Sequence, residues 1–195
     1  MGLTGLNEYL KENYDISIFD HAVKTGEILD FHLNWENVLR GKVNENLKYS
    51  VRIESGDTGE ISEYEKLNIR LVYPGAISGK VFPLIKPDDK IKKMKLSSTM
   101  KVSARNHIKN KTLYSLMTDR EVVFFTLIGG EKLKGLIGSF ARYEIVLKMK
   151  GGIPITILRH GVYDLRNKKG RCFLKSTQET AKDWKKSEQY IDAPN

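Results

Sequence analysis

The stretch FTLIGGEKLKGLIGSFARYEIVL, Phe125 to Leu147, decides the fold of this 195-residue chain. Its first residues belong to the β-branched and aromatic run Val122 to Ile128, which is typical of a strand. The Gly129–Gly130 pair is a two-residue hairpin signal, and an alternating strand comes after it. The third strand is Tyr143 to Lys150. The pattern therefore predicts three consecutive antiparallel strands.

Elements on either side of this stretch complete a small unit. Upstream, Ser103 is placed to cap a helix that runs to about Thr118. Downstream, Gly151–Gly152 turns the chain into a fourth strand of alternating isoleucines, and a short fifth strand covers Val162 to Leu165. Glycines at positions 135 and 138 mark where the second strand bends or bulges. A helix and five short, bent strands in about 60 residues predict a small barrel.

The chain also contains a diverged first copy of this unit. FHLNWENVLRGKVNENLKYSVRI, Phe31 to Ile53, lies on Phe125 to Leu147 without gaps at an offset of 94, with Gly41 on Gly135 and Tyr49 on Tyr143. Further on, LVYPGAIS from residue 71 resembles ILRHGVYD from residue 157 at an offset of 86. That second offset predicts about eight extra residues in the first copy, in a lengthened hairpin loop.

The net charge of +9 is unevenly distributed. Residues 1–85 carry a net charge of −4, residues 86–111 carry +7 and residues 112–195 carry +6. The central stretch has the composition of a linker and includes nine Lys and Arg residues. It is either a solvated connector or an arm that neutralises phosphates.

Several classes of protein do not fit the sequence. The one cysteine, Cys172, excludes a disulfide framework within the chain, and four histidines are scattered without metal-ligand spacing. No Gly-rich phosphate loop or nucleophile motif is present. The apolar runs are too short to span a bilayer, and the first residues lack the pattern of a signal peptide. We therefore expect a cytoplasmic protein without enzymatic activity, cofactor, metal or membrane contact.

The second copy, Thr112 to about Arg166, resembles the bacterial Sm-like RNA chaperone Hfq. The resemblance lies in four short motifs: Leu133-x-Gly135-x-Ile137, Ser139-Phe140, Ile145-Val146-Leu147 and the basic–His–Gly step Arg159-His160-Gly161. It implies a helix on a bent five-stranded SH3-like sheet, assembled into a ring of six units. It also implies binding of uridine-rich RNA on one face and adenine-rich RNA on the other.

The predicted fold class is thus mainly β with N-terminal helices, in two tandem Sm-like barrels. The expected organisation is a diverged Sm-like domain over 1–82, a basic linker over 83–102, an Hfq-like domain over 103–175 and a tail over 176–195. Three chains with two units each would make a six-unit ring. A monomer with its barrels paired internally is less favoured, because it leaves two outer edges open.

The predicted function is single-stranded RNA binding, as an RNA chaperone or post-transcriptional regulator. Tyr143 offers a ring for base stacking, and Arg142, Arg159 and His160 offer donors for phosphates and base edges. Without the resemblance, core packing of Tyr143 and a structural His160 are the simpler readings. The remaining predicted RNA-binding residues are Ser139, Phe140, Lys132 and Lys134, with weaker candidates Lys48, Tyr49, Lys109 and Arg120.

The first copy is expected to have lost much of this site, because Tyr73-Pro74 takes the place of Arg159-His160 in the alignment. Thr126 stands where the family has a tyrosine on its adenine-binding face, so stacking there is in doubt. The alternative function is a ring scaffold for protein contacts with little RNA specificity.

Overall fold

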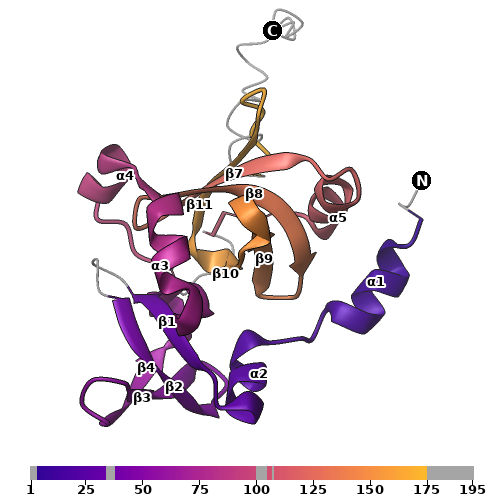
Figure 1. Cartoon of the computed structure of the whole chain (residues 1–195). Coiled ribbons are helices and arrows are strands. Elements are labelled where there is room, and N and C mark those ends of the chain that lie inside the picture. Colours follow the sequence, from indigo (N-terminus) through magenta and orange to yellow (C-terminus); the bar gives the residue numbers. More distant parts are fainter. Residues whose placement is uncertain (1–3, 34–37, 100–104, 107, 175–195) are drawn as a thin grey trace, which may run out of the picture.

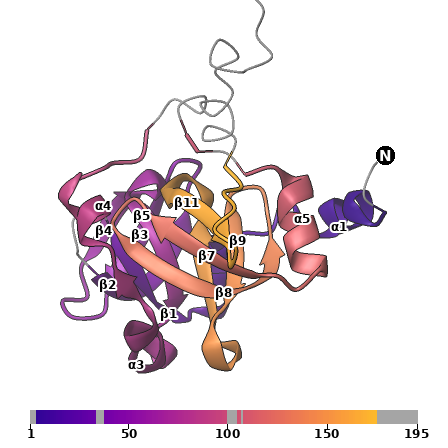
Figure 2. The same ribbon diagram turned by 90° about the horizontal axis from the view of Figure 1, so that it is seen from above.

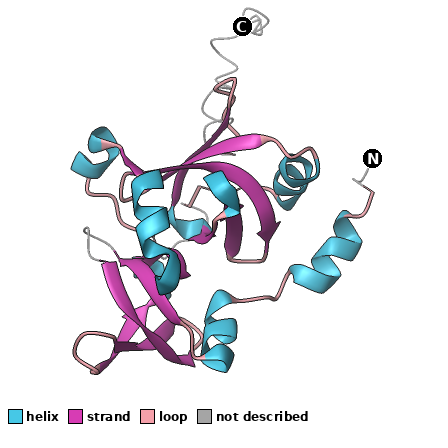
Figure 3. Ribbon diagram, viewed as in Figure 1, coloured by secondary structure: helices cyan, strands magenta, loops and turns pink. Residues whose placement is uncertain are grey.

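The computed structural model describes residues 4–33, 38–99, 105–106 and 108–174. Within them the chain is mainly β, and its strands form one large antiparallel sheet with helices around it (Figures 1 and 3). Ser103, the predicted helix cap, and the tail 176–195 lie outside the described residues. None of the described helices is long and apolar enough to cross a membrane.

The first repeat consists of one helix and five strands. The helix α2 (Ile18–Thr25) begins at the N-cap Ser17, whose Oγ accepts a hydrogen bond from the Phe19 N–H. The strands are β1 (Ile28–Leu33), β2 (Val38–Asn46), β3 (Ser50–Ser55), β4 (Ile61–Glu65) and β5 (Ile69–Pro74). A further helix, α1 (Leu6–Asn13), precedes the repeat and is not predicted from the sequence.

The second repeat has the same elements in the same order. They are α5 (Asn110–Thr118), β7 (Val122–Leu127), β8 (Glu131–Phe140), β9 (Glu144–Lys148), β10 (Pro154–Leu158) and β11 (Val162–Asn167). Gly130, with φ of 87°, makes the predicted hairpin turn between β7 and β8. The connection between the repeats contains α3 (Ser78–Val81), β6 (Lys86–Pro87) and α4 (Asp89–Lys93), with β6 paired to β8.

Each repeat arranges its strands in the order fifth, first, second, third, fourth. The order through the whole sheet is β11-β7-β8-β9-β10-β5-β1-β2-β3-β4. The two repeats meet where β10, the fourth strand of the second, pairs with β5, the fifth strand of the first. The pairing closes neither repeat into a separate barrel. It leaves β11 and β4 as the outer strands of one continuous sheet, and Figure 2 shows it from above.

The strand registers confirm the predicted repeat at an offset of 94. In the first repeat Lys42 pairs with Glu54. In the second repeat Leu136 pairs with Lys148, and each of these two residues lies 94 positions after its counterpart. Both second strands also shift register at one place, between Val43 and Glu45 and between Ile137 and Ser139. The bulge predicted near Gly138 is therefore a property of both copies.

The second predicted offset, 86, is wrong. In the third-to-fourth strand pairing, Val51 faces Tyr64 as Ile145 faces Ile157, which gives an offset of 93. The structural counterpart of Arg159-His160-Gly161 is therefore Lys66-Leu67-Asn68, which forms a 3₁₀ turn at the same place. The alignment by residue similarity places the fifth strand of one copy on the fourth strand of the other. The first copy has one extra residue rather than about eight.

A glycine in the second strand of each repeat is required by close backbone approach. A Cβ atom on Gly41 would overlap the carbonyl oxygen of Glu54, and one on Gly135 would overlap the carbonyl oxygen of Lys148. The neighbouring strand comes this close because the sheet bends at the glycine. The same steric requirement explains why this glycine is present in both copies.

The apolar core forms two clusters that exchange residues across the junction. Leu71 and Tyr73 of β5 pack in the cluster of the second repeat, with Phe125 and Leu147. In return, Leu158 of β10 packs in the cluster of the first repeat. The exchanged side chains are removed from water only when the two repeats are together, so their burial stabilises the junction.

Candidate nucleic-acid interface

The loop between β8 and β9 presents an exposed aromatic side chain among the predicted RNA-binding residues of the second repeat. Tyr143 in this loop is 65% exposed, so core packing does not account for it. Its carbonyl oxygen accepts a hydrogen bond of 2.9 Å from the Arg159 N–H. This bond holds the tyrosine next to the basic 3₁₀ turn Arg159–Gly161. An exposed aromatic ring beside fixed cations is a surface on which a base can stack.

Arg142 lies beside Tyr143 and is held by the segment that follows α1. Its backbone N–H donates to the Tyr14 carbonyl oxygen at 2.8 Å. Its guanidinium lies 4.9 Å from the centre of the Tyr14 ring, and Nη2 lies 3.0 Å from Oδ1 of Asp15. A hydrogen bond with Tyr143 and the nearby Asp15 carboxylate raise the pKa of Arg142. The guanidinium is about half exposed, so a phosphate has access to it.

Arg159 is placed beneath this loop. Its Nη1 donates to Oδ1 of Asn110 at 2.9 Å, and its guanidinium lies 5.5 Å from the centre of the Phe140 ring. Nε and Nη2 are buried without a hydrogen-bond partner among the described residues, and burial lowers the pKa of Arg159 to about 10. The Phe140 ring itself is 2% exposed and stacks against Tyr9 at 4.7 Å. Phe140 therefore supports the loop from the core and offers no open face to a base.

His160 lies at the junction of the two repeats. Its Nε2–H donates to the carbonyl oxygen of Ile69 in β5 at 2.8 Å. Burial lowers the pKa of His160 to about 4, and the charge of Arg105 acts in the same direction, so the ring is neutral at pH 7. The next residue lies close to β5, because a Cβ on Gly161 would be only 3.1 Å from the Cβ of Arg70. In this structure His160 joins the repeats through its ring.

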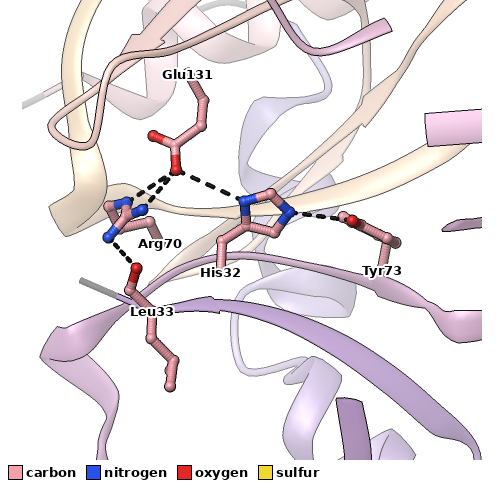
Figure 4. Close-up of polar contacts among 5 residues, drawn as sticks. All are labelled: His32, Leu33, Arg70, Tyr73 and Glu131. Atoms are coloured by element: carbon pink, nitrogen blue, oxygen red, sulfur yellow. Dashed lines mark hydrogen bonds and ion pairs between the residues drawn. The ribbon is translucent and has the colours of Figure 1, made fainter. Parts of the chain in front are cut away.

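A buried polar cluster fastens the same junction (Figure 4). Nη2 of Arg70 in β5 lies 2.6 Å from Oε1 of Glu131 in β8, and Nη1 of Arg70 donates to the Leu33 carbonyl oxygen at 2.5 Å. Nδ1 of His32 lies 3.6 Å from the same carboxylate oxygen, and its Nε2 is hydrogen-bonded to the Tyr73 hydroxyl at 3.0 Å. Despite its burial, the contact with His32 and the hydrogen bonds from Arg70 lower the pKa of Glu131 to about 2.

Lys132 and Lys134 lie on a different surface, a groove of about 1270 Å³ over the outer side of β7 and β8. Phe124 lines it, and Nζ of Lys134 lies 5.6 Å from the centre of that ring. Nζ of Lys132 pairs with Oδ2 of Asp88 at 2.9 Å. The groove contains seven basic residues and two acidic ones: Lys86, Arg120, Lys132, Lys134, Lys148, Lys150, Arg166, Asp88 and Asp164. The predicted candidates therefore occupy two separate surfaces, because none of Arg142, Tyr143, Arg159 and His160 lines the groove.

The first repeat has a counterpart of the exposed tyrosine loop. Tyr49 is 72% exposed, and its carbonyl oxygen accepts a hydrogen bond of 2.9 Å from the Lys66 N–H, as that of Tyr143 does from Arg159. Nζ of Lys48 lies 5.1 Å from the centre of the Tyr49 ring. Lys66 donates through Nζ to the Leu47 carbonyl oxygen. The basic step that the sequence alignment treats as lost is therefore present as Lys66, while Leu67 replaces the histidine.

The remaining candidates are less central. Ser139 is half-buried at the β8 register shift, and Lys109 is exposed immediately before α5. Sequence reasoning misses Lys66, because the correct alignment depends on strand pairing rather than on residue similarity. It also misses Tyr14 and Asp15, since they precede the repeat and reach the site only through the tertiary fold.

Comparison of the chain with protein-family models, with curated proteins and with solved structures finds no match. The geometry and the sequence pattern are therefore what bears on function.

Proposed function

We propose that this protein is a tandem Sm-like protein that binds single-stranded RNA and acts as an RNA chaperone or post-transcriptional regulator, without catalytic activity. The observation that carries the proposal is the exposed tyrosine held against a basic 3₁₀ turn, which occurs twice at equivalent positions, Tyr143 with Arg159 and Tyr49 with Lys66. Base stacking on a tyrosine is tolerant of sequence and is worth about 1–3 kcal/mol per base. Nearby cations bind the backbone.

The basic groove supports the same function through phosphate contacts. Seven Lys and Arg side chains against two acidic residues give it a strong positive charge, and Phe124 adds an aromatic ring to its lining. A strand that passes from the tyrosine loop to this groove would meet cations on both surfaces. Uridine-rich RNA is the ligand that we propose for the tyrosine loop, and adenine-rich RNA for the groove side.

We further propose that three chains form a ring of six units. Inside the chain, β10 pairs with β5 with Ile157 opposite Leu71. The outer strands β4 and β11 are the counterparts of these two strands, so the same contact between chains would place Tyr64 opposite Asp164. Unpaired strand edges favour association with another strand. Repetition of this contact closes a ring when the rotation between units matches.

The RNA proposal is tested by fluorescence anisotropy with oligo(U), oligo(A) and oligo(C) of about 16 nucleotides over a range of salt concentrations. We expect binding that weakens as salt rises, and a loss of about 5- to 150-fold for oligo(U) in Tyr143→Ala, since one stacked base contributes about 1–3 kcal/mol. Phe82→Ala is the control, because Phe82 is an aromatic residue that is 67% exposed and lies outside both surfaces. Equal loss in both variants, or no binding, contradicts the proposal and favours the scaffold function.

The ring is tested by light scattering and by cross-linking. The expected mass is that of three chains. In a Cys172→Ser background, Tyr64→Cys together with Asp164→Cys should form disulfides between chains, because facing residues in an antiparallel pair have a suitable Cα separation of about 4.5–5.5 Å. A pair at a neighbouring, non-facing position, Glu65→Cys with Asp164→Cys, is the control. A stable monomer at micromolar concentration would rule out the ring.

A further inference from the structure

Helix α1 belongs to neither repeat, yet it packs on the second. Leu6, Tyr9 and Leu10 lie against the apolar cluster of the second repeat, and the Tyr9 ring is 5.7 Å from that of Tyr114 in α5. Figures 1 and 2 both show α1 beside α5. The chain then runs past the β8–β9 loop before it enters α2 of the first repeat. We call residues Leu6–Asp15 the N-terminal strap.

The strap is attached to the end of β8 and to the tyrosine loop by hydrogen bonds to their backbone groups. The Tyr9 hydroxyl accepts from the Phe140 N–H at 2.6 Å and donates to the Phe140 carbonyl oxygen at 2.9 Å. The Tyr14 carbonyl oxygen accepts from the Arg142 N–H at 2.8 Å. The conformation of the loop that carries Arg142 and Tyr143 is therefore fixed from the strap. These bonds also fix the position of the residue that follows Tyr14.

That residue is Asp15, whose Oδ1 lies 3.0 Å from Nη2 of Arg142. A carboxylate at this distance occupies one donor position of the guanidinium, which is the position that a phosphate oxygen would take. The Asp15 side chain is 82% exposed, so it makes this contact from the solvent side, from which a ligand must approach. In the first repeat the equivalent cation, Lys48, lies instead over the ring of Tyr49.

We propose that Asp15 competes with the phosphate backbone of RNA for Arg142, so that the strap sets the affinity of the second-repeat site. This inference rests on the proposed RNA binding at the Arg142–Tyr143 loop. Tyr9 and Tyr14 are positioning residues that hold the loop and deliver the carboxylate. A bound phosphodiester displaces Asp15 from the guanidinium, and Asp15 then returns to solvent. The contact is reversible because both partners are exposed.

The test is a double-mutant cycle on oligo(U) binding with the full chain at about 50 mM salt. Asp15→Asn should bind about two- to fivefold more tightly than the natural chain, in keeping with the small contribution of an exposed ion pair. Arg142→Gln should bind more weakly, and adding Asp15→Asn to Arg142→Gln should change nothing further. Glu12→Gln is the matched control, because it removes an equal charge from the strap at an exposed residue.

Each outcome decides the proposal. Tighter binding that depends on Arg142 supports competition by Asp15. If Asp15→Asn and Glu12→Gln tighten binding equally, or if the effect of Asp15→Asn persists without Arg142, only the general charge of the strap matters and the inference is wrong. If the natural chain binds oligo(U) and Arg142→Gln weakens it while Asp15→Asn has no effect, the inference fails and the proposed function stands. If no variant binds oligo(U), both fail. Unchanged thermal unfolding of Asp15→Asn excludes an effect through folding.

Discussion

Arg70 of the first repeat lies against Glu131 of the second, with Nη2 and Oε1 2.6 Å apart and both side chains almost completely removed from solvent. The guanidinium also fills the space above Gly129, where a Cβ would lie 2.5 Å from its nitrogens. The two buried charges face each other only when the two repeats are docked. The pair therefore favours this one arrangement of the two repeats over others that would leave the charges apart.

Breaking this pair should destabilise the chain strongly. We expect Arg70→Met to lower the free energy of unfolding by about 3–5 kcal/mol, because it leaves the Glu131 carboxylate buried without its cation. Adding Glu131→Gln should recover part of the loss. Denaturant unfolding measures both. Arg52→Ala, which breaks an ion pair between half-exposed side chains, is the control and should cost under about 1 kcal/mol. Equal losses in the two variants would show that the junction does not depend on the buried pair.

The bend glycines should be intolerant of even one methyl group. Gly41→Ala and Gly135→Ala should each cost about 1–3 kcal/mol, because the new Cβ overlaps a carbonyl oxygen of the neighbouring strand. Gly79→Ala is the control, since no atom lies within 4 Å of the position that its Cβ would take and the change favours a helix. Thermal unfolding compares the three. If Gly135→Ala unfolds at the same temperature as the natural chain, the neighbouring strand can shift to accommodate the methyl group, and the prediction is wrong.

Glu144 should make stability fall as pH rises. It is buried at the start of β9, where it accepts hydrogen bonds from the Ile18 N–H and the Ser17 hydroxyl. Burial, aided by the charge of Asp20 and opposed by these bonds and by Lys66, raises its pKa from 4.5 to about 7. The folded state thus holds the proton more tightly than the unfolded state. Stability is full below pH 4.5 and is lost between about pH 4.5 and 7, up to about 3 kcal/mol.

Glu144→Gln tests this effect, because it keeps an acceptor for the Ile18 N–H and removes the titration. The variant should be more stable than the natural chain at about pH 8 and about equal to it near pH 4.5, in denaturant unfolding at each pH. Glu8→Gln, at an exposed position of α1, should follow the natural chain throughout. An unchanged pH dependence in Glu144→Gln would contradict the raised pKa.

His160 should act in the opposite direction. Its pKa falls from 6.5 to about 4 on folding, chiefly through burial, so the folded state resists protonation. Stability is full above pH 6.5 and is lost as pH falls towards 4, by up to about 3 kcal/mol. The two effects nearly cancel between pH 4.5 and 6.5. Between pH 4.5 and 6.5, His160→Gln, which keeps an N–H for the Ile69 carbonyl oxygen, should leave the falling trend from Glu144. If that variant still loses stability as pH falls from 6.5 to 4.5, a window above the titration of Glu131, another group is responsible.

Much of the second repeat could be predicted, because its strands carry their own signals. Gly129–Gly130 turns the chain where expected, and the alternation around Ile155 and Ile157 marks β10 correctly. The prediction for the first repeat is wrong at one point. It aligns Gly75 with Gly161 because both are glycines, whereas strand pairing makes Asn68 the equivalent of Gly161. A local match of eight residues cannot distinguish a fourth strand from a fifth. Both are short and apolar, and only the partner of each strand tells them apart.

The sequence by itself determined the local elements, the offset of 94 and the glycines at the bends, because hydrophobic alternation, turn residues and steric limits act over a few neighbours. The tertiary structure alone decided which strands meet, that β10 joins β5 inside one chain, and that Lys66 stands where Arg159 does. It also decided that Asp15 reaches Arg142 across 127 residues of chain and that Phe140 turns inward while Tyr143 stays exposed. These contacts follow from long-range packing, which buries side chains according to their place in the sheet rather than their neighbours in the sequence.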